Sequence, residues 1–194
     1  MNPEREGKRS EETEVKLPCT DLAAVGAKLR ERGATLREEK HAEHNVLYDD
    51  PRGELSGRGC TLRLRTAGPD VILTFKGPAR FDGGLKIREE REVRVSDAAE
   101  AAALLSGIGL VPRFRYEKQR ESWEHAGCTV SLDETPIGRF LEVEGNPADI
   151  RRALTDLGLD FSEAIPYSYP SLYARRRRED PTLPPDMVFG DREG

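Results

Sequence analysis

The sequence predicts an α+β fold, in which about eight antiparallel strands form a closed or nearly closed β-barrel with helices packed on its outside. Three observations support this prediction. Successive strands alternate charged and apolar side chains, so that the charges of each strand share one face. Several helical segments are available to cover the apolar face. A charged sheet face of this extent either lies open to solvent or closes on itself as a polar-lined barrel.

The chain of 194 residues suits one domain, for which we expect the range 11–178. We expect residues 1–10 to form a flexible leader and residues 179–194 a proline-rich, charged tail, although apolar residues such as Leu183 and Met187 could dock on the domain. The net charge is −5 although 35% of the residues are charged. Such a balance argues against general binding of polyanions, so we expect no nucleic-acid partner.

The three cysteines are Cys19, Cys60 and Cys128, which are far apart and lack any C-x-x-C spacing. This pattern argues against a disulfide framework and against a zinc site. No apolar run approaches the length of a membrane span, and the first ten residues lack the apolar core of a signal peptide. The sequence therefore predicts a soluble cytoplasmic protein that has no membrane partner.

The first expected strand covers residues 11–17 and sets Glu12, Glu14 and Lys16 on one face. Two carboxylates at this spacing can share a divalent cation, and the lysine can hold an anion that the cation also touches. A half-buried strand with a solvated face gives the same pattern, so one strand alone decides nothing. Thr20 or Asp21 can cap the next helix, which ends at Gly33.

Residues 34–50 have an extended character and end at an Asp-Asp-Pro breaker, followed by a glycine-rich turn around Leu55. The next strands, 60–66 and 71–76, form a hairpin around the turn 67–70. On the hairpin, the side chains that share the polar face are Arg63, Arg65, Thr74 and Lys76. Basic residues therefore face one way along two neighbouring strands.

Residues 77–84 form a glycine- and proline-rich loop, and the strand 86–95 follows it. Its in-phase residues are Lys86, Arg88, Glu90, Glu92 and Arg94. Asp97 then caps an alanine-rich helix that runs to about Leu105 and is stopped by glycines.

A long strand over 111–125 carries Lys118 and Arg120 in phase, and the strand 128–133 returns to end at Asp133. The strand 140–144 repeats the opening pattern with Glu142 and Glu144 on one face. Pro147 begins a further helix that Gly158 ends, and a short helix is expected over 168–178.

Carboxylates thus occur as Glu-x-Glu pairs, and cations occur as Arg-x-Arg pairs or single lysines on other strands. A solvated face needs no such grouping, whereas inward charges must be paired or bound to ions. The grouping therefore favours a binding site. The remaining alternative is a polar scaffold whose charges only pair with one another.

Taken in order, these motifs resemble those of the CYTH superfamily, the triphosphate tunnel metalloenzymes, over roughly residues 11 to 178. The motifs are Glu12-x-Glu14-x-Lys16, Arg63-x-Arg65, Thr74-Phe75-Lys76-Gly77-Pro78, Arg88-x-Glu90-x-Glu92, Lys118-x-Arg120, Asp133 and Phe140-Leu141-Glu142-Val143-Glu144-Gly145. The group that looks most similar is the class IV adenylyl cyclase and thiamine triphosphatase-like group.

The resemblance implies an eight-stranded tunnel that holds a triphosphate and Mg²⁺ or Mn²⁺. Carried over to this chain, the metal ligands would be Glu12, Glu14, Glu142 and Glu144, assisted by Asp133 or Glu92. The phosphate-binding residues would be Lys16, Arg63, Arg65, Lys76, Lys86, Arg88, Lys118 and Arg120. The chemistry agrees, since Mg²⁺ prefers carboxylates together with substrate phosphates, and arginines hold phosphates through paired donors.

For catalysis the resemblance to the triphosphatases of the family implies that Lys76 activates water with Tyr48 nearby, and cations around the lysine would lower its pKa. The resemblance leaves the reaction open. A cyclase would convert ATP to cyclic AMP and pyrophosphate, whereas a triphosphatase would hydrolyse tripolyphosphate or thiamine triphosphate. A non-catalytic sensor of polyphosphate or nucleotide is the alternative, and a homodimer is expected by resemblance.

Overall fold

The computed structural model describes residues 10–190. Its strands are β1 (Ser10–Pro18), β2 (Thr35–Asp49), β3 (Thr61–Ala67), β4 (Asp70–Lys76), β5 (Arg80–Asp82), β6 (Leu85–Val95), β7 (Val111–His125), β8 (Cys128–Thr135) and β9 (Gly138–Glu144). Its helices are α1 (Leu22–Glu31), α2 (Glu54–Gly57), α3 (Ala98–Gly107), α4 (Pro147–Asp156), a 3₁₀ turn η1 (Phe161–Glu163) and α5 (Tyr169–Glu179).

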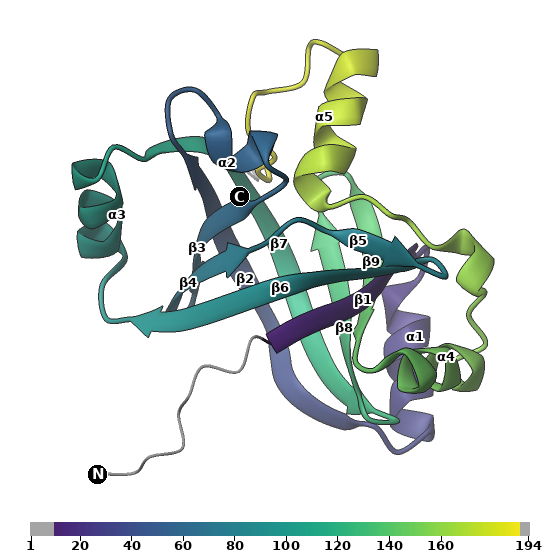
Figure 1. Cartoon of the computed structure of the whole chain (residues 1–194). Helices are drawn as coiled ribbons and strands as arrows, with labels where there is room; N and C mark the ends of the chain where they lie inside the picture. Colours follow the sequence, from purple (N-terminus) through teal and green to yellow (C-terminus); the bar gives the residue numbers. More distant parts are fainter. Residues whose placement is uncertain (1–9, 191–194) are drawn as a thin grey trace, which may run out of the picture.

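The strands form one antiparallel sheet in the order β1-β9-β8-β7-β2-β3-β4-β6-β5, and an additional pairing of β1 with β6 closes it (Figure 1). The closed ring contains every described strand except β5, which pairs only with β6. The predicted fold class, an antiparallel barrel with helices outside, is confirmed.

Strand β1 closes the barrel by pairing along both of its edges. Residues 10–14 of β1 pair with β6, whereas residues 14–18 pair with β9. At the changeover, Glu14 lies opposite Lys86 on one side and opposite Glu144 on the other. The first strand therefore brings charged residues from two distant parts of the chain into one neighbourhood.

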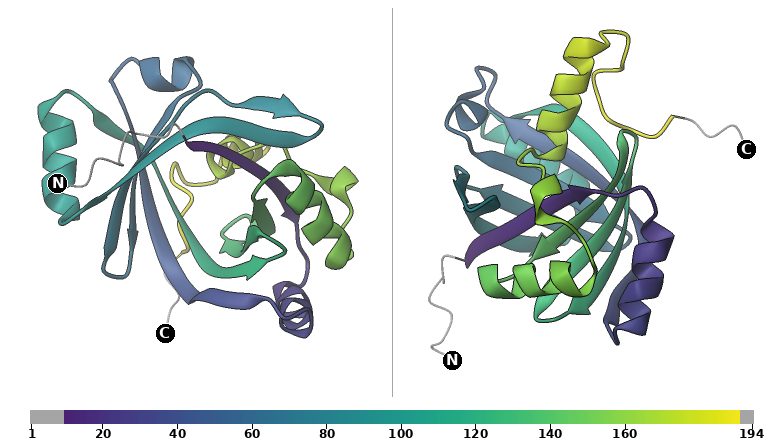
Figure 2. Two further views of the ribbon diagram at one scale, coloured as in Figure 1. Left: turned by 60° about the horizontal axis from the view of Figure 1, so that its bottom comes forward. Right: turned by 90° about the vertical axis from the view of Figure 1, so that its right-hand side faces the viewer.

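Helices cover the barrel from outside because the outward side chains of the strands are apolar (Figure 2). Helices α1 and α4 pack on β8 and β9, where outward residues such as Val15 and Leu141 join Leu29 and Ile150 in the largest core cluster. Helix α3 lies on the opposite side against β3. Helix α5 lies across one end of the barrel.

The predicted helix starts are confirmed by their caps. The Asp21 carboxylate accepts from the Ala24 amide at 2.9 Å, and Asp97 accepts from two amides of the first turn of α3. Asn146 accepts from the Asp149 amide at 3.0 Å, with proline following it at the first helical position.

Two segments predicted as turn and loop contain further short elements. Residues 54–57 form α2 because the buried Asp49 carboxylate accepts from the amides of Leu55 and Ser56, both at 2.9 Å. Residues 80–82 form β5, since Gly83 and Gly84 adopt positive φ angles and turn this segment back onto β6. Local capping and turn chemistry, rather than strand periodicity, explains both elements.

The C-terminal segment docks on the barrel. The side chain of Met187 is fully buried, and its backbone pairs with β7 through the Arg115 carbonyl and the Glu117 amide, both at 2.9 Å. Strand β8 pairs with β7 only from Gln119 onward, so this segment supplies hydrogen-bond partners where β8 has none. Residues 1–9 of the predicted leader and residues 191–194 of the predicted tail lie outside the described part.

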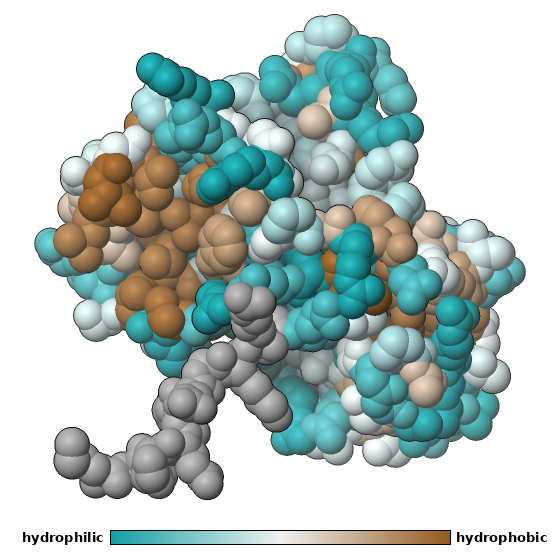
Figure 3. Space-filling model, viewed as in Figure 1, coloured by the Kyte–Doolittle hydropathy of each residue, from teal (hydrophilic) through white to brown (hydrophobic). Residues whose placement is uncertain are grey.

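An apolar area of the surface lies around α3 and is brown in Figure 3. Leu104 and Ile108, at the end of this helix, are 72% and 76% exposed. Among residues 10–190, no helix is both long and apolar enough to cross a membrane.

Candidate active site inside the barrel

A cavity of about 1060 Å³ occupies the inside of the barrel, and charged side chains line most of it. All eight predicted phosphate-binding residues lie on its wall: Lys16, Arg63, Arg65, Lys76, Lys86, Arg88, Lys118 and Arg120. Five of the predicted metal ligands also line it: Glu12, Glu14, Glu92, Glu142 and Glu144. Strand alternation therefore placed nearly the whole predicted set correctly on the inner face.

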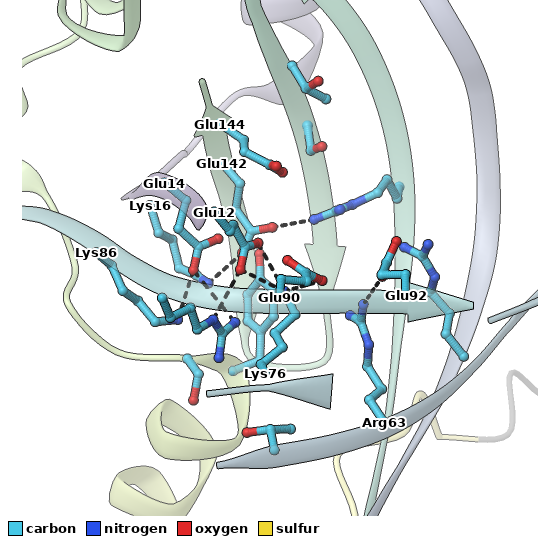
Figure 4. Close-up of a pocket in the computed structure, with 18 of the residues that line it drawn as sticks. Glu12, Glu14, Lys16, Arg63, Lys76, Lys86, Glu90, Glu92, Glu142 and Glu144 are labelled. Carbon is cyan, nitrogen blue, oxygen red and sulfur yellow. Dashed lines mark hydrogen bonds and ion pairs between the residues drawn. The ribbon is translucent and has the colours of Figure 1, made fainter. Parts of the chain in front are cut away.

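The acidic residues of β1 and β9 lie side by side (Figure 4). In the antiparallel register, Glu14 is opposite Glu144 and Lys16 is opposite Glu142. Such opposed pairs have Cβ atoms about 5 Å apart. The two Glu-x-Glu motifs, which are well separated in sequence, thus form one acidic group.

Most of these carboxylates are held by cations from neighbouring strands. The Glu12 carboxylate accepts from Lys76 Nζ at 2.9 Å and from Arg88 Nε at 3.1 Å. Lys86 Nζ lies 2.8 Å from Glu14. Glu142 accepts from Lys16 Nζ at 2.5 Å and also from Arg120. The inward charges are therefore paired, as their burial requires.

Glu12 and Glu90 respond to burial in opposite ways. Burial disfavours the Glu12 carboxylate, but Lys76 and Arg88 outweigh burial and lower its pKa to about 2. For Glu90, burial and the nearby Glu12 outweigh Lys76 and raise the pKa to about 8. At neutral pH Glu90 thus keeps its proton while Glu12 is ionised.

Lys76 does not lie in the predicted group of cations. Its Nζ atom is 2.9 Å from Glu12 and 3.0 Å from Glu90, so its nearest charged partners are acidic residues. By contrast, the pKa of Lys86 is lowered, because burial together with Arg88 and Lys16 outweighs Glu14. The surroundings expected for Lys76 are therefore corrected.

Glu144 is the carboxylate without a cation. Among the described residues its side chain makes no hydrogen bond or ion pair. Burial and the negative charges of Glu12, Glu14 and Glu142 outweigh the positive charge of Lys76 and raise the pKa of Glu144 to about 7. A carboxylate that faces other carboxylates and is paired with no cation is a position where a bound cation would be stabilised.

This donor set fits a divalent metal that is completed by substrate. Within residues 10–190, no three acidic, histidine or cysteine side chains form a ready-made ligand set. Mg²⁺, however, binds through one or two carboxylates plus substrate phosphates. The adjacent Glu14 and Glu144 provide such a pair, with phosphate-binding cations close by.

Asp133 lies behind the cavity wall, unlike the other predicted metal ligands. It is fully buried, and its carboxylate accepts from Lys118 at 3.2 Å, from Arg120 at 2.7 and 2.6 Å, and from the Tyr169 hydroxyl at 2.7 Å. With four donors its oxygens are already satisfied. In this structure Asp133 positions cations rather than facing the cavity.

Glu92 lines the cavity at some distance from the acidic group. Its carboxylate accepts from the Thr74 hydroxyl at 2.7 Å and from Arg63 at 3.4 Å (Figure 4). Glu92 therefore orients Arg63, an arginine that is predicted to bind phosphate.

Tyr48 does not reach the cavity, which corrects its predicted place beside Lys76. It is 7% exposed and packs with Leu64 and Leu105 in the apolar cluster outside the barrel. Its neighbour Leu47 lines the cavity instead. Since strand side chains alternate, only one of two successive residues faces inward, and the prediction chose the wrong one.

Sequence reasoning missed three residues of the site, of which Glu90 and Tyr169 line the cavity and Glu43 is buried behind its wall. Glu43 is 1% exposed and lies 3.2 Å from Arg65 and 3.3 Å from Lys118, which overcome burial and lower its pKa. Glu90 was in phase but not assigned to the site. Tyr169 comes from α5, where no strand pattern applies. For Glu43, the alternation with Asn45 and Leu47 was the available signal.

We expect the metal-free protein to lose stability as the pH rises from about 5 to about 8. The unfolded chain releases the protons of Glu90 and Glu144 near pH 4.5, whereas the folded protein keeps them until about 8 and 7, so folding takes up protons in this window. Thermal denaturation with a chelator at pH 5.5 and 8.5 measures the difference. Glu90→Gln should make the difference in melting temperature between the two pH values smaller. A wild-type melting temperature that does not change across this range contradicts the raised pKa values of Glu90 and Glu144.

Comparison with known proteins supports the motif assignment. The sequence pattern of the CYTH domain family matches residues 10–164. No curated protein is detectably similar in sequence to this chain.

Solved structures share the fold. A candidate adenylate cyclase from Vibrio parahaemolyticus superposes with a TM-score of 0.74 at 18% identity, and the match covers 86% of this chain and 99% of that protein. A protein from Pyrococcus horikoshii is 28% identical, with a TM-score of 0.70 and coverage of 86% and 99%. A candidate adenylyl cyclase from Hippeastrum, described as having a dominant triphosphatase activity, is 20% identical, with a TM-score of 0.62 and coverage of 91% and 99%.

Proposed function

Since the chain belongs to the CYTH domain family, we propose that it is a divalent-metal-dependent enzyme that acts on a triphosphate bound inside the barrel. The observation that carries this proposal is the composition of the cavity wall. The eight predicted phosphate-binding lysine and arginine residues line the cavity together with a group of carboxylates, in which Glu144 makes no ion pair with a cation among the described residues. A chain of phosphates with a bound metal satisfies both charges at once.

The cations, which are now paired with carboxylates, would pair with phosphate oxygens instead when the substrate binds. Arg63 and Arg65 each bury an Nε atom that makes no hydrogen bond among the described residues, so a shift of either guanidinium toward a phosphate breaks no hydrogen bond at this atom. Lys16, Lys86 and Arg88 lie beside the acidic group, where phosphates that also contact the metal would bind. The paired charges thus prepare the site for an anion without leaving buried cations unpaired.

Mg²⁺ or Mn²⁺ held by Glu14 and Glu144, with Glu12 and Glu142 adjacent, would neutralise charge that develops on the reacting phosphate. Lys76 stays the proposed catalytic residue, since it lies at the acidic group on the cavity wall. Its Nζ atom lies 2.9 Å from Glu12 and 3.0 Å from Glu90, so the ammonium would stand beside the carboxylates that hold the metal, where it can stabilise charge on the reacting phosphate.

Two reactions fit this site. The Hippeastrum protein is described by a dominant triphosphatase activity, whereas the Vibrio protein is described as a candidate adenylate cyclase. A triphosphatase needs only the phosphates and a held water. A class IV-type cyclase needs in addition that the ribose hydroxyl reaches the α-phosphorus. We propose the metal-dependent triphosphate chemistry common to both.

The test is to incubate the purified protein with Mg²⁺ or Mn²⁺ and, separately, ATP, tripolyphosphate and thiamine triphosphate, and to resolve the products by chromatography. We expect turnover of at least one substrate that stops when a chelator is added. Cyclic AMP with pyrophosphate identifies a cyclase, whereas orthophosphate identifies a phosphohydrolase. Tight binding without any product overturns the enzyme proposal and favours the sensor.

A further inference from the structure

Tyr169 connects α5 to the polar interior of the barrel. It is the first residue of α5, it is 4% exposed, and with its neighbours Ser168 and Pro170 it lines the cavity at the end that α5 covers. Its ring packs against Phe140 and Tyr116, at centroid distances of 5.3 and 6.4 Å. The side chain is therefore fixed in place from several sides.

The hydroxyl of Tyr169 donates to Asp133 Oδ2 at 2.7 Å. The same carboxylate holds Lys118 and Arg120, which both line the cavity. Burial, and then the charge of Asp133, raise the pKa of Tyr169 well above its ordinary value, so the hydroxyl stays a donor. Tyr169 thus occupies one hydrogen-bond acceptor position of the Asp133 carboxylate. Without the hydroxyl, only Lys118 and Arg120 would be left to satisfy that position.

The ring of Tyr169 also contacts the motif lysine of β1. Lys16 Nζ lies 3.8 Å from the ring centroid, and the lysine residue as a whole is 5% exposed. Lys118 Nζ is 5.5 Å from the same centroid. An ammonium over a tyrosine face at these distances is attracted by the ring while its remaining donors stay available. One side chain therefore contacts two cavity cations directly and reaches a third through Asp133.

We propose that Tyr169 is a positioning residue, which holds Lys16, Lys118 and Arg120 in the arrangement that binds the anion. The inference rests on the proposed function, because these three residues are taken to bind phosphate. It assigns to α5 a part in substrate binding that extends beyond covering the barrel end.

Tyr169→Phe isolates the hydroxyl, since the ring and its packing remain. Without this donor, Asp133 draws more strongly on Lys118 and Arg120, and these cations are less available to phosphates. We expect the KM for the triphosphate to rise at least about fivefold with a smaller change in kcat, since a hydrogen bond to a charged group is stronger than one between neutral groups.

Tyr173→Phe is the matched control. Tyr173 lies one turn further along α5, is 3% exposed, and donates to the carbonyls of Pro184 and Asp186 at 2.8 and 3.1 Å, away from the cavity. Tyr173→Phe should lower the melting temperature about as much as Tyr169→Phe does. Its KM for the triphosphate should nevertheless stay within about twofold of the wild-type value. Equal kinetic effects in the two variants mean that Tyr169 only stabilises α5, and the inference fails.

Calorimetric binding of tripolyphosphate separates this inference from the proposed function. If the wild type binds but never turns over, the enzyme proposal fails, while an at least fivefold weaker affinity of Tyr169→Phe still supports the inference. If the wild type binds no tripolyphosphate, both fail. A double-mutant cycle with Asp133→Asn should be non-additive, because the hydroxyl acts through that carboxylate. Additive effects exclude this route.

Discussion

Glu144→Gln is expected to lower metal-dependent turnover of the triphosphate at least about 100-fold and, at the same time, to make the metal-free protein more stable at pH 8. Turnover falls because the amide cannot replace a negative oxygen ligand of Mg²⁺ or Mn²⁺. Stability rises because Glu144 has no cation partner among residues 10–190 and faces Glu12, Glu14 and Glu142. Activity and stability therefore change in opposite directions.

The pH dependence fixes the sign of the stability change. The pKa of Glu144 is raised from 4.5 to about 7, so ionised Glu144 disfavours the folded state above pH 7, and below pH 4.5 the carboxyl is neutral in both states. The melting temperature of the variant should therefore exceed that of the wild type at pH 8 and equal it at pH 4. A variant that is less stable at pH 8 contradicts the proposed role.

Glu89→Gln provides the control for this substitution. Glu89 lies on β6, one residue from Glu90, and forms its ion pair with the half-exposed Arg91. Exposed pairs of this kind contribute about 0–1 kcal/mol. Turnover should stay within about twofold of the wild type, and a large loss here means that charge changes on β6 disturb the site indirectly.

Asp133→Asn is expected to destabilise the protein by about 3 kcal/mol, which corresponds to a melting temperature about 6–12 °C lower. The carboxylate is fully buried and holds Lys118 and Arg120. An amide leaves these cations with Glu43 and Glu142 as their remaining carboxylate partners. Removing one member of a buried charge network costs more than the same change at the surface.

Circular dichroism during heating measures this change, with Glu134→Gln as the matched control. Glu134 follows Asp133 on β8, and its carboxylate lies 2.7 Å from Lys40, whose side chain is 54% exposed. The control should melt within about 2 °C of the wild type. If both variants melt alike, the buried network contributes little and the role given to Asp133 is wrong.

The barrel could be predicted because most of its strands show an alternation of charged and apolar residues in the sequence. Glu12 and Glu14, like Arg63 and Arg65, occur at spacings that only a strand places on one face, and the structure sets them on the cavity wall. Helix caps such as Asp21 and Asp97 were equally readable, since their side chains act within a few residues. The fold could therefore be predicted from sequence patterns that involve residues close together in the chain.

What the sequence could not provide depends on contacts between distant residues. Asp133 was placed among the metal ligands because its spacing does not reveal that Tyr169 and two cations surround it. Tyr48 was assigned to the site by resemblance to the family, whereas β2 alternates so that Leu47 faces the cavity and Tyr48 faces outward. That Glu144 is the carboxylate without a cation follows only from the register of β1 with β9 and β6.

The double pairing of β1 also has a consequence for synthesis. Because β1 pairs with β9 through residues 140–144, the barrel cannot close until the ribosome has released nearly three quarters of the chain. Strand β6 can pair with residues 10–14 earlier, but the part of β1 that pairs with β9 stays unpaired until then, and such long-range pairing slows folding. Glu12 and Glu14 belong to this strand, so the acidic group assembles only when the ring closes. A nascent chain therefore gains the acidic group only after β9 has been made, and Tyr169 follows later in the chain.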